Sequence, residues 1–105
     1  MAVSPTIIAG FEPLLQAPAR LQIMAILVQA QQAEFARLRD LTGTSDSVMS
    51  KHLSALADAR LIKLTKSAID GRQRTWASVT RTGRTTFHQH VAALQGIIAG
   101  TTNPV

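Results

Sequence analysis

The sequence predicts a mainly α-helical fold of the α+β class, in which a three-helix core carries a two-stranded β-hairpin and a long C-terminal helix. Three observations support this prediction. Residues 44–59 repeat apolar side chains at helical spacing, Gly43 leaves only a tight turn before them, and a basic segment containing Asp70-Gly71 follows them. Apolar residues at i, i+4 and i+7 share one helix face, and Asp-Gly between alternating segments is a strong hairpin signal.

The N-terminal region predicts a short helical segment followed by the central helix. The apolar residues within 7–15 are interrupted by Gly10 and Pro13, so we expect one or two turns there rather than a long helix. Pro18 suits the first position of a helix, where its missing N–H is not needed. Residues 20–30 are apolar on most sides, which predicts a buried central helix.

The second helix is predicted over residues 36–42, after a brief strand at 34–35. Leu38 and Leu41 are expected to point into the core, and Gly43 supplies the left-handed residue that ends the helix. A tight turn between two short helices is typical of a helix-turn-helix.

The third helix, predicted over residues 44–59 with Thr44 or Ser45 as its cap, has two different faces. Met49, Leu53 and Leu56 form the face expected to be buried. The opposite face is hydroxyl-rich and cationic, with Ser47, Ser50, Lys51 and Ser54. Ser forms helices less readily than the Glu, Lys and Gln that usually cover a solvated face. This composition therefore suits a helix pressed into a narrow space such as a DNA major groove.

A hairpin is predicted directly after the third helix. Residues 61–66 and 74–80 alternate apolar and polar side chains as strands do, with residues 67–73 and their Asp70-Gly71 turn as the connection. A basic hairpin that follows a helix-turn-helix is a wing. The predicted fold is therefore a winged helix.

The last helix is predicted over residues 81–99, with Thr80 as its cap. Its apolar residues are spaced four, three and four apart, so they form one stripe that either packs on its own domain or meets a second copy. Pairing this helix with the N-terminal segment across a two-fold axis would cover both apolar elements, and we prefer this interpretation. The candidate dimer contacts are Ile7, Phe11, Leu14, Phe87, Val91, Leu94 and Ile98.

Length and composition predict one domain, residues 1–105, with 1–17 and 81–99 as dimerisation elements around a winged helix at 18–80. The chain has 46% hydrophobic residues and no cysteine, so it can bury a core but cannot form disulfides. No apolar stretch reaches the roughly 18 to 20 residues that span a bilayer, and the N-terminus lacks the features of a secretory signal. We therefore expect a cytoplasmic protein that contacts no membrane.

The positive charge lies in one region. The formal net charge is +5, and residues 44–84 contain eight Lys and Arg residues against three Asp, whereas the rest of the chain is balanced. Such asymmetry is typical of a protein that binds a polyanion through one surface. A cationic excess can also serve only to keep a surface solvated.

In their order and residues, these segments resemble the winged-helix transcriptional regulators of bacteria and archaea, most closely the small MarR-like group that contains little beyond the DNA-binding domain. The matching stretches are residues 18–23, 35–41, 44–56, 70–76 and 80–84. Arg60 departs from the family pattern, which usually has Gly after the third helix. If that position needs a left-handed backbone, Arg costs about 1 kcal/mol there.

The resemblance implies a homodimer on operator DNA, with the third helix in the major groove and the wing on the backbone or the adjacent minor groove. The candidate contacts are Ser45, Asp46, Ser47, Ser50, Lys51 and Ser54 in the helix, and Lys66, Arg72, Gln73 and Arg74 in the wing. Lys51 could reach guanine O6/N7 or a phosphate, and Arg72 a minor groove. Simpler roles stay open, because Asp46 would favour the helix dipole in any case and hairpin charges also protect a strand edge.

The predicted function is a sequence-specific DNA-binding transcriptional regulator, a homodimeric repressor on a pseudo-palindromic operator. Its partners would be double-stranded DNA and a second copy, and the sequence names no small-molecule effector. The alternative is a winged-helix adaptor that binds proteins and no DNA. No enzyme activity, cofactor or metal is expected, because the chain has no phosphate loop and no clustered acid–base pair, and His88 and His90 face different directions.

Overall fold

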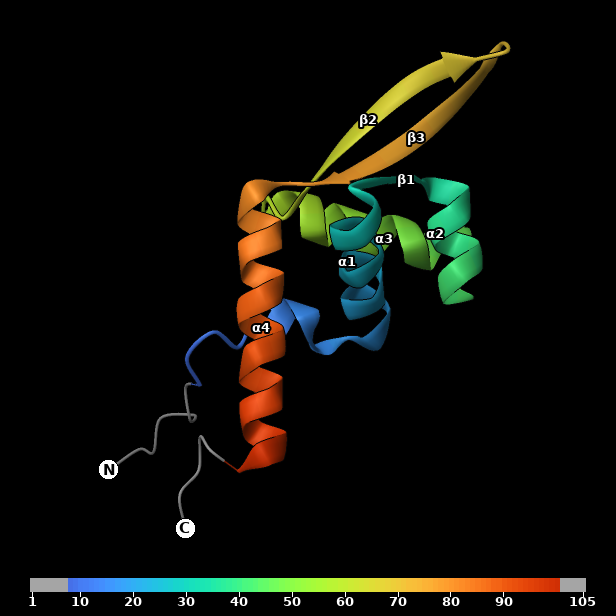
Figure 1. Ribbon diagram of the computed structural model, residues 1–105. Coiled ribbons are helices and arrows are strands. Elements are labelled where there is room, and N and C mark those ends of the chain that lie inside the picture. The colour runs from blue at the N-terminus through green and yellow to red at the C-terminus, as the bar shows by residue number, and fades with distance from the viewer. Residues whose placement is uncertain (1–7, 101–105) are drawn as a thin grey trace.

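Four α-helices gather at one end of a small antiparallel sheet, and two strands of that sheet extend away from them as a hairpin (Figure 1). The computed structural model describes residues 8–100. The elements are a 3-10 helix η1 (Pro13–Gln16), α1 (Pro18–Ala30), β1 (Gln32–Glu34), α2 (Phe35–Thr42), α3 (Asp46–Asp58), β2 (Ile62–Ile69), β3 (Arg72–Val79) and α4 (Arg81–Ala99). The predicted mainly α-helical winged helix of the α+β class is confirmed.

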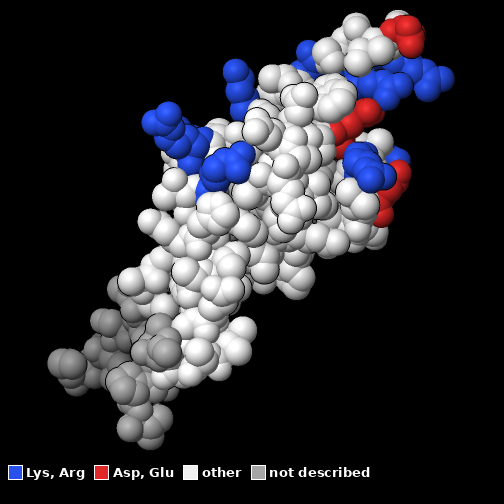
Figure 2. Space-filling model, in the orientation of Figure 1, with Lys and Arg blue, Asp and Glu red and all other residues white. Residues whose placement is uncertain are grey.

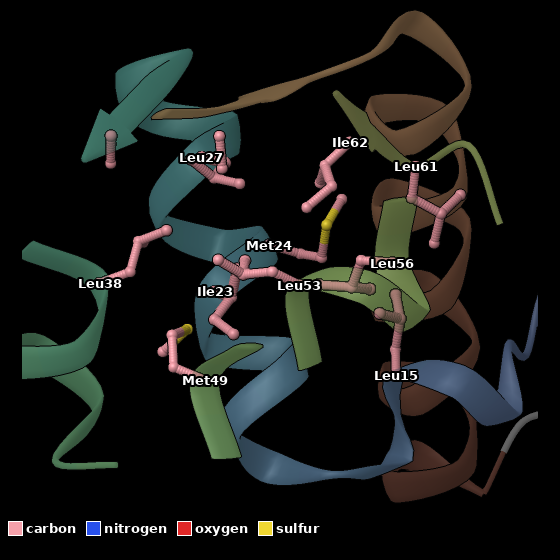
Figure 3. Close-up of a cluster of buried hydrophobic side chains, with 12 residues drawn as sticks. Leu15, Ile23, Met24, Leu27, Leu38, Met49, Leu53, Leu56, Leu61 and Ile62 are labelled. Atoms are coloured by element: carbon pink, nitrogen blue, oxygen red, sulfur yellow. The ribbon is translucent and has the colours of Figure 1, made fainter. Parts of the chain in front are cut away.

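The hydrophobic core lies where α1, α2 and α3 meet the base of the sheet (Figure 3). The predicted buried triplet of α3 is confirmed, with Met49 and Leu56 0% exposed and Leu53 2% exposed. Leu38 is also fully buried, but the prediction for Leu41 is wrong, since 42% of this residue is exposed. Leu41 lies in the last turn of a helix of only eight residues, where it lines a shallow surface concavity instead of the core.

The turn between α2 and α3 is built as its residues predict. Gly43 ends α2 in the left-handed conformation, with φ of 67°. Ser45 caps α3, and its Oγ accepts a hydrogen bond from the Val48 N–H at 3.2 Å. These local signals set the short separation between the two helices of the helix-turn-helix.

The hairpin is longer than predicted. β2 continues to Ile69 and β3 resumes at Arg72, so the proposed connection over residues 67–73 is wrong and only Asp70 and Gly71 form the loop. Both loop residues have positive φ, 53° and 74°, as a two-residue turn that matches the strand twist requires. Because this turn needs no further residues, the two strands pair up to its edges.

The sheet has three strands in the order β1-β3-β2, because β1 joins the predicted two-stranded wing at its base. The brief strand expected at residues 34–35 lies at Gln32–Glu34, where it pairs antiparallel with β3, and α2 already begins at Phe35. Ala33 lies opposite Ala77, and both are buried. This pairing attaches the base of the hairpin to the core. The alternation of residues 61–66 predicts inward positions for Ile62 and Leu64, but only Ile62 is buried, at 3% exposed. Beyond it β2 leaves the core, so Leu64 is 36% exposed.

The long helix α4 begins where the hairpin ends. Thr80 caps it as predicted, with its Oγ1 accepting a hydrogen bond from the Gly83 N–H at 2.9 Å. The helix runs along the side of the domain and continues beyond the three-helix core (Figure 1). Within residues 8–100, no helix combines the length and apolarity needed to cross a membrane.

Arg60 occupies the left-handed conformation that its unusual place after α3 suggested, with φ of 62°. We expect Arg60→Gly to raise the free energy of unfolding by about 0.5 to 1 kcal/mol, because Gly removes the clash of Cβ at positive φ. Chemical denaturation would measure the change. Arg60→Ala removes the charge but keeps Cβ and should give no such gain, so equal effects of the two variants would contradict this explanation.

Candidate nucleic-acid interface

The outer face of α3 is open to solvent along its length. Ser47, Ser50, Lys51 and Ser54 are all exposed, opposite the fully buried triplet of the same helix. The two predicted faces are therefore present, and on the outer one short serine side chains lie on both sides of Lys51. A helix with this outline can approach a surface or a groove closely.

The N-terminal end of α3 is held by an ion pair that the sequence did not reveal. The Arg39 Nη1 donates to Asp46 Oδ1 at 2.9 Å, and the Arg39 Nε donates to Asp40 Oδ1 at 3.0 Å. The hydrogen bond to Asp46 makes the largest contribution to raising the pKa of Arg39, and the hydrogen bond to Asp40 adds to it. Arg39 thus lies beside the N-terminal end of α3 as an additional cation, and the carboxylate of Asp46 has a partner within the protein.

The strand register divides the wing residues between two faces. Lys66 lies opposite Thr75 and Ser67 lies opposite Arg74. Because successive side chains alternate across a sheet, Lys66 shares a face with Thr75, whereas Arg74 lies on the other. Gln73, opposite Ala68 and exposed, belongs to the face of Lys66.

Arg74 is used inside the protein. Its Nη1 donates to both carboxylate oxygens of Glu34 at 3.0 Å, which joins β3 to β1. Arg72, two residues nearer the tip on the same face, is exposed. Of the two arginines predicted to meet DNA, Arg72 is therefore the freer, and DNA contact by Arg74 stays a prediction.

A cleft of about 290 Å³ separates α3 from the hairpin. Three hydroxyl side chains and one ammonium group border it, together with an apolar floor. The lining residues are Ser50, Ser54, Lys66, Thr75, Phe35, Leu53 and Leu64. The cleft thus joins two parts of the predicted interface that lie far apart in the chain.

Charged side chains are unevenly distributed over the molecule. In Figure 2 the Lys and Arg residues gather over the hairpin and the neighbouring end of the domain, whereas the opposite end shows no charged side chain on this face. The sequence agrees, because residues 85–105 contain no Asp, Glu, Lys or Arg. A cationic end suits a polyanion and an uncharged end suits a protein contact.

The N-terminal segment predicted to take part in dimerisation is attached to α4. The Glu12 backbone N–H donates to His90 Nδ1 at 2.9 Å, and the ring of Phe11 lies 4.9 Å from that of His90. Leu14 packs against the core of its own chain. Ile7 lies outside the described residues.

The predicted dimer residues of α4 change from buried to exposed along the helix. Phe87 packs against the core of its own chain, Val91 and Leu94 are half-buried, and Ile98 is 84% exposed. Ile97, which the 4-3-4 spacing did not include, is 41% exposed. The C-terminal half of α4 therefore carries an apolar surface.

His90 is buried, with 1% of the residue exposed. The sequence indicated only that His90 and His88 face different directions and are therefore unsuited to bind one metal ion together. Burial lowers the pKa of His90, and the charge of Glu12 offsets part of this shift. Among residues 8–100, no group of three His, Cys, Asp or Glu side chains could hold a metal ion. The histidine acts instead as a hydrogen-bond acceptor that attaches the N-terminal segment.

This acceptor role predicts acid sensitivity of the fold. Protonated His90 cannot accept the Glu12 N–H, and its pKa in the folded chain lies below the ordinary 6.5. The unfolded chain then binds the proton more readily, so the free energy of unfolding is highest above about pH 6.5 and falls as the pH drops below it. Denaturation at several pH values would measure this slope.

His90→Asn offers a test, because Asn can accept the same hydrogen bond but does not titrate. We expect a weaker pH dependence in this variant and an unchanged one in His88→Asn, since His88 is exposed. His52, whose pKa is also lowered by burial and by Arg20, remains in both variants. Identical slopes in wild type and His90→Asn would exclude His90 as the cause.

A helix-turn-helix whose second helix exposes a polar face, followed by a basic antiparallel hairpin, is the architecture of winged-helix DNA-binding domains. Residues 19–98 match the family of winged helix DNA-binding domains, and the chain belongs to this family. The chain is 29% identical over 72 residues to uncharacterized protein MJ0432 of Methanocaldococcus jannaschii. The matched residues cover 69% of this chain and 78% of that protein.

Two solved structures are similar over most of the chain. A transcriptional regulator homologue from Pyrococcus horikoshii OT3 has a TM-score of 0.77 and 26% identity, covering 84% of this chain and 87% of that chain. The YusO protein of Bacillus subtilis has a TM-score of 0.72 and 23% identity, covering 80% of this chain and 59% of that chain. The resemblance to MarR-like winged-helix regulators is thereby confirmed.

Proposed function

We propose that this chain is a transcriptional repressor that binds a pseudo-palindromic operator as a homodimer. The observation that carries the proposal is the outer face of α3, where Ser47, Ser50, Lys51 and Ser54 are all exposed while the opposite face is fully buried. In a DNA-binding domain such a helix enters the major groove. Lys51 then reaches guanine O6/N7 or a phosphate, and the first serines of the helix read bases.

The wing supplies the second contact with DNA. Arg72 is exposed beside the two-residue tip at Asp70 and Gly71, so it can reach a minor groove or its phosphates. Phosphate contacts add affinity without reading sequence. We therefore expect much of the affinity to come from the wing and from the presence of two copies.

Dimerisation is supported by the end of the molecule opposite the wing. The C-terminal half of α4 has no charged residue and exposes Ile97 and Ile98. A two-fold axis beside this helix would bury these side chains in both copies and hold both recognition helices on one DNA face, about 34 Å apart. Blocking access of the transcription machinery to the operator then suffices for repression.

The DNA contact is tested by measuring affinity against salt on duplexes selected from random DNA. We expect log K to fall with log salt, with a slope of several units per dimer. Lys51→Ala should weaken binding about tenfold and relax base preference at one position, since one specific contact contributes about 1 to 3 kcal/mol. Arg72→Ala should weaken binding to all sequences and make the salt slope about 0.9 units shallower for each phosphate that the protein no longer neutralises.

Arg37→Ala provides the matched control, because Arg37 is an exposed arginine of α2 that lines a concavity with Trp76, on the hairpin face away from α3. It should leave the affinity unchanged. A salt-independent affinity, or equal binding of all duplexes at every salt concentration, would refute the proposed function and favour a protein-binding adaptor.

A further inference from the structure

The cleft between α3 and the hairpin contains polar side chains that the protein itself leaves unused. Ser50 and Ser54 lie one turn apart on α3, and Lys66 and Thr75 are directly opposed on β2 and β3. Within residues 8–100, none of these four side chains makes a hydrogen bond or an ion pair with another protein group. A serine inside a helix often uses its hydroxyl to bond to the carbonyl of the preceding turn. Ser50 and Ser54 make no such bond, so both hydroxyls are available to a ligand.

The cleft has the chemistry of an anion site. Its polar groups are three hydroxyls, which can donate hydrogen bonds, and the ammonium of Lys66, which only donates. No carboxylate of the described residues lines it. Phe35, Leu53 and Leu64 form an apolar floor that limits hydration of a bound group and strengthens its interaction with the ammonium.

The course of DNA past the protein identifies the anion. A major groove and the adjacent minor groove are separated by one sugar–phosphate strand. If α3 occupies the first groove and the hairpin tip reaches the second, this strand must pass between them, and the space between them is this cleft. A phosphate of that strand would therefore meet the four polar side chains.

We propose that Ser50, Ser54, Lys66 and Thr75 form a phosphate cradle that holds the DNA strand between the recognition helix and the wing. This inference rests on the proposed DNA binding and changes the expected role of two serines. Ser50 and Ser54 contact the backbone instead of reading bases. Thr75, which was not among the predicted DNA contacts, becomes one, and base reading is left to Ser47 and Lys51.

Thr75→Val tests the cradle, because it removes only a hydroxyl and valine is well suited to a strand. We expect about a three- to tenfold loss of affinity, equal for all duplexes, because hydrogen bonds to charged groups are among the stronger ones. Thr65→Val is the matched control, since Thr65 lies on β2 opposite Trp76, on the face away from α3. It should bind DNA as wild type does.

Duplexes with one neutral methylphosphonate at successive positions locate the phosphate. Wild type should lose affinity when the cradled phosphate is neutral. The Lys66→Gln and Thr75→Val proteins already lack a contact to this phosphate, so making it neutral should lower their affinity little further. Binding by Thr75→Val equal to that of wild type would overturn the cradle, as would a changed base preference in Ser50→Ala. Failure of wild type to bind any duplex would overturn the proposed function as well, so the two failures are distinguishable.

Discussion

Gly83→Ala is expected to destabilise the protein by about 3 kcal/mol and to lower its melting temperature by more than about 10 °C. Gly83 is buried in the first turn of α4, and a Cβ there would overlap the carbonyl oxygen of Leu61. That oxygen belongs to the backbone and accepts hydrogen bonds from both the N–H and the Oγ1 of Thr80 at 3.1 Å. It cannot move aside without breaking these hydrogen bonds to Thr80.

Thermal and urea unfolding followed by circular dichroism would measure this loss. Thr82→Ala, at an exposed neighbouring position of α4, is the control and should change the free energy of unfolding by less than about 0.5 kcal/mol. A loss below about 1 kcal/mol in Gly83→Ala would mean that α4 and the start of β2 can separate slightly without cost. The close approach would then not be a fixed part of the fold.

The features of the fold that the sequence predicted correctly depend on local signals. Gly43 and the cap residues Ser45 and Thr80 act within a few residues of their own positions, and the structure confirms all three. The buried and open faces of α3 follow from helical period alone. This is why the central part of the candidate interface could be placed before any tertiary contact was known.

The features that were missed depend on contacts between distant segments. The Glu34–Arg74 ion pair and the hydrogen bond between the Glu12 N–H and His90 join residues that no local pattern relates. The division of the wing into two faces, in contrast, does follow from a local signal. A two-residue loop at Asp70 and Gly71 fixes the strand register, and this register places Thr75 opposite Lys66.

Ile98→Glu is expected to convert the proposed dimer to monomers and to lower DNA affinity by at least about 100-fold. Ile98 is 84% exposed, so a charge there costs nothing in the isolated chain. In a dimer the same charge would be buried without a partner, because residues 85–105 contain no charged side chain. Burial of an unpaired charge costs several kcal/mol, and a monomer also loses the second recognition helix. Sedimentation and DNA titration would measure the two effects.

Ile69→Glu is the matched control for the oligomeric state, since Ile69 is also exposed, at 43%, but lies beside the hairpin tip. This variant should remain dimeric, because the hairpin extends away from the end of α4 that we assign to the dimer (Figure 1). A dimeric Ile98→Glu protein with normal DNA affinity would exclude the C-terminal half of α4 as the interface. The N-terminal segment that Glu12 and Phe11 attach to His90 would then be the next candidate.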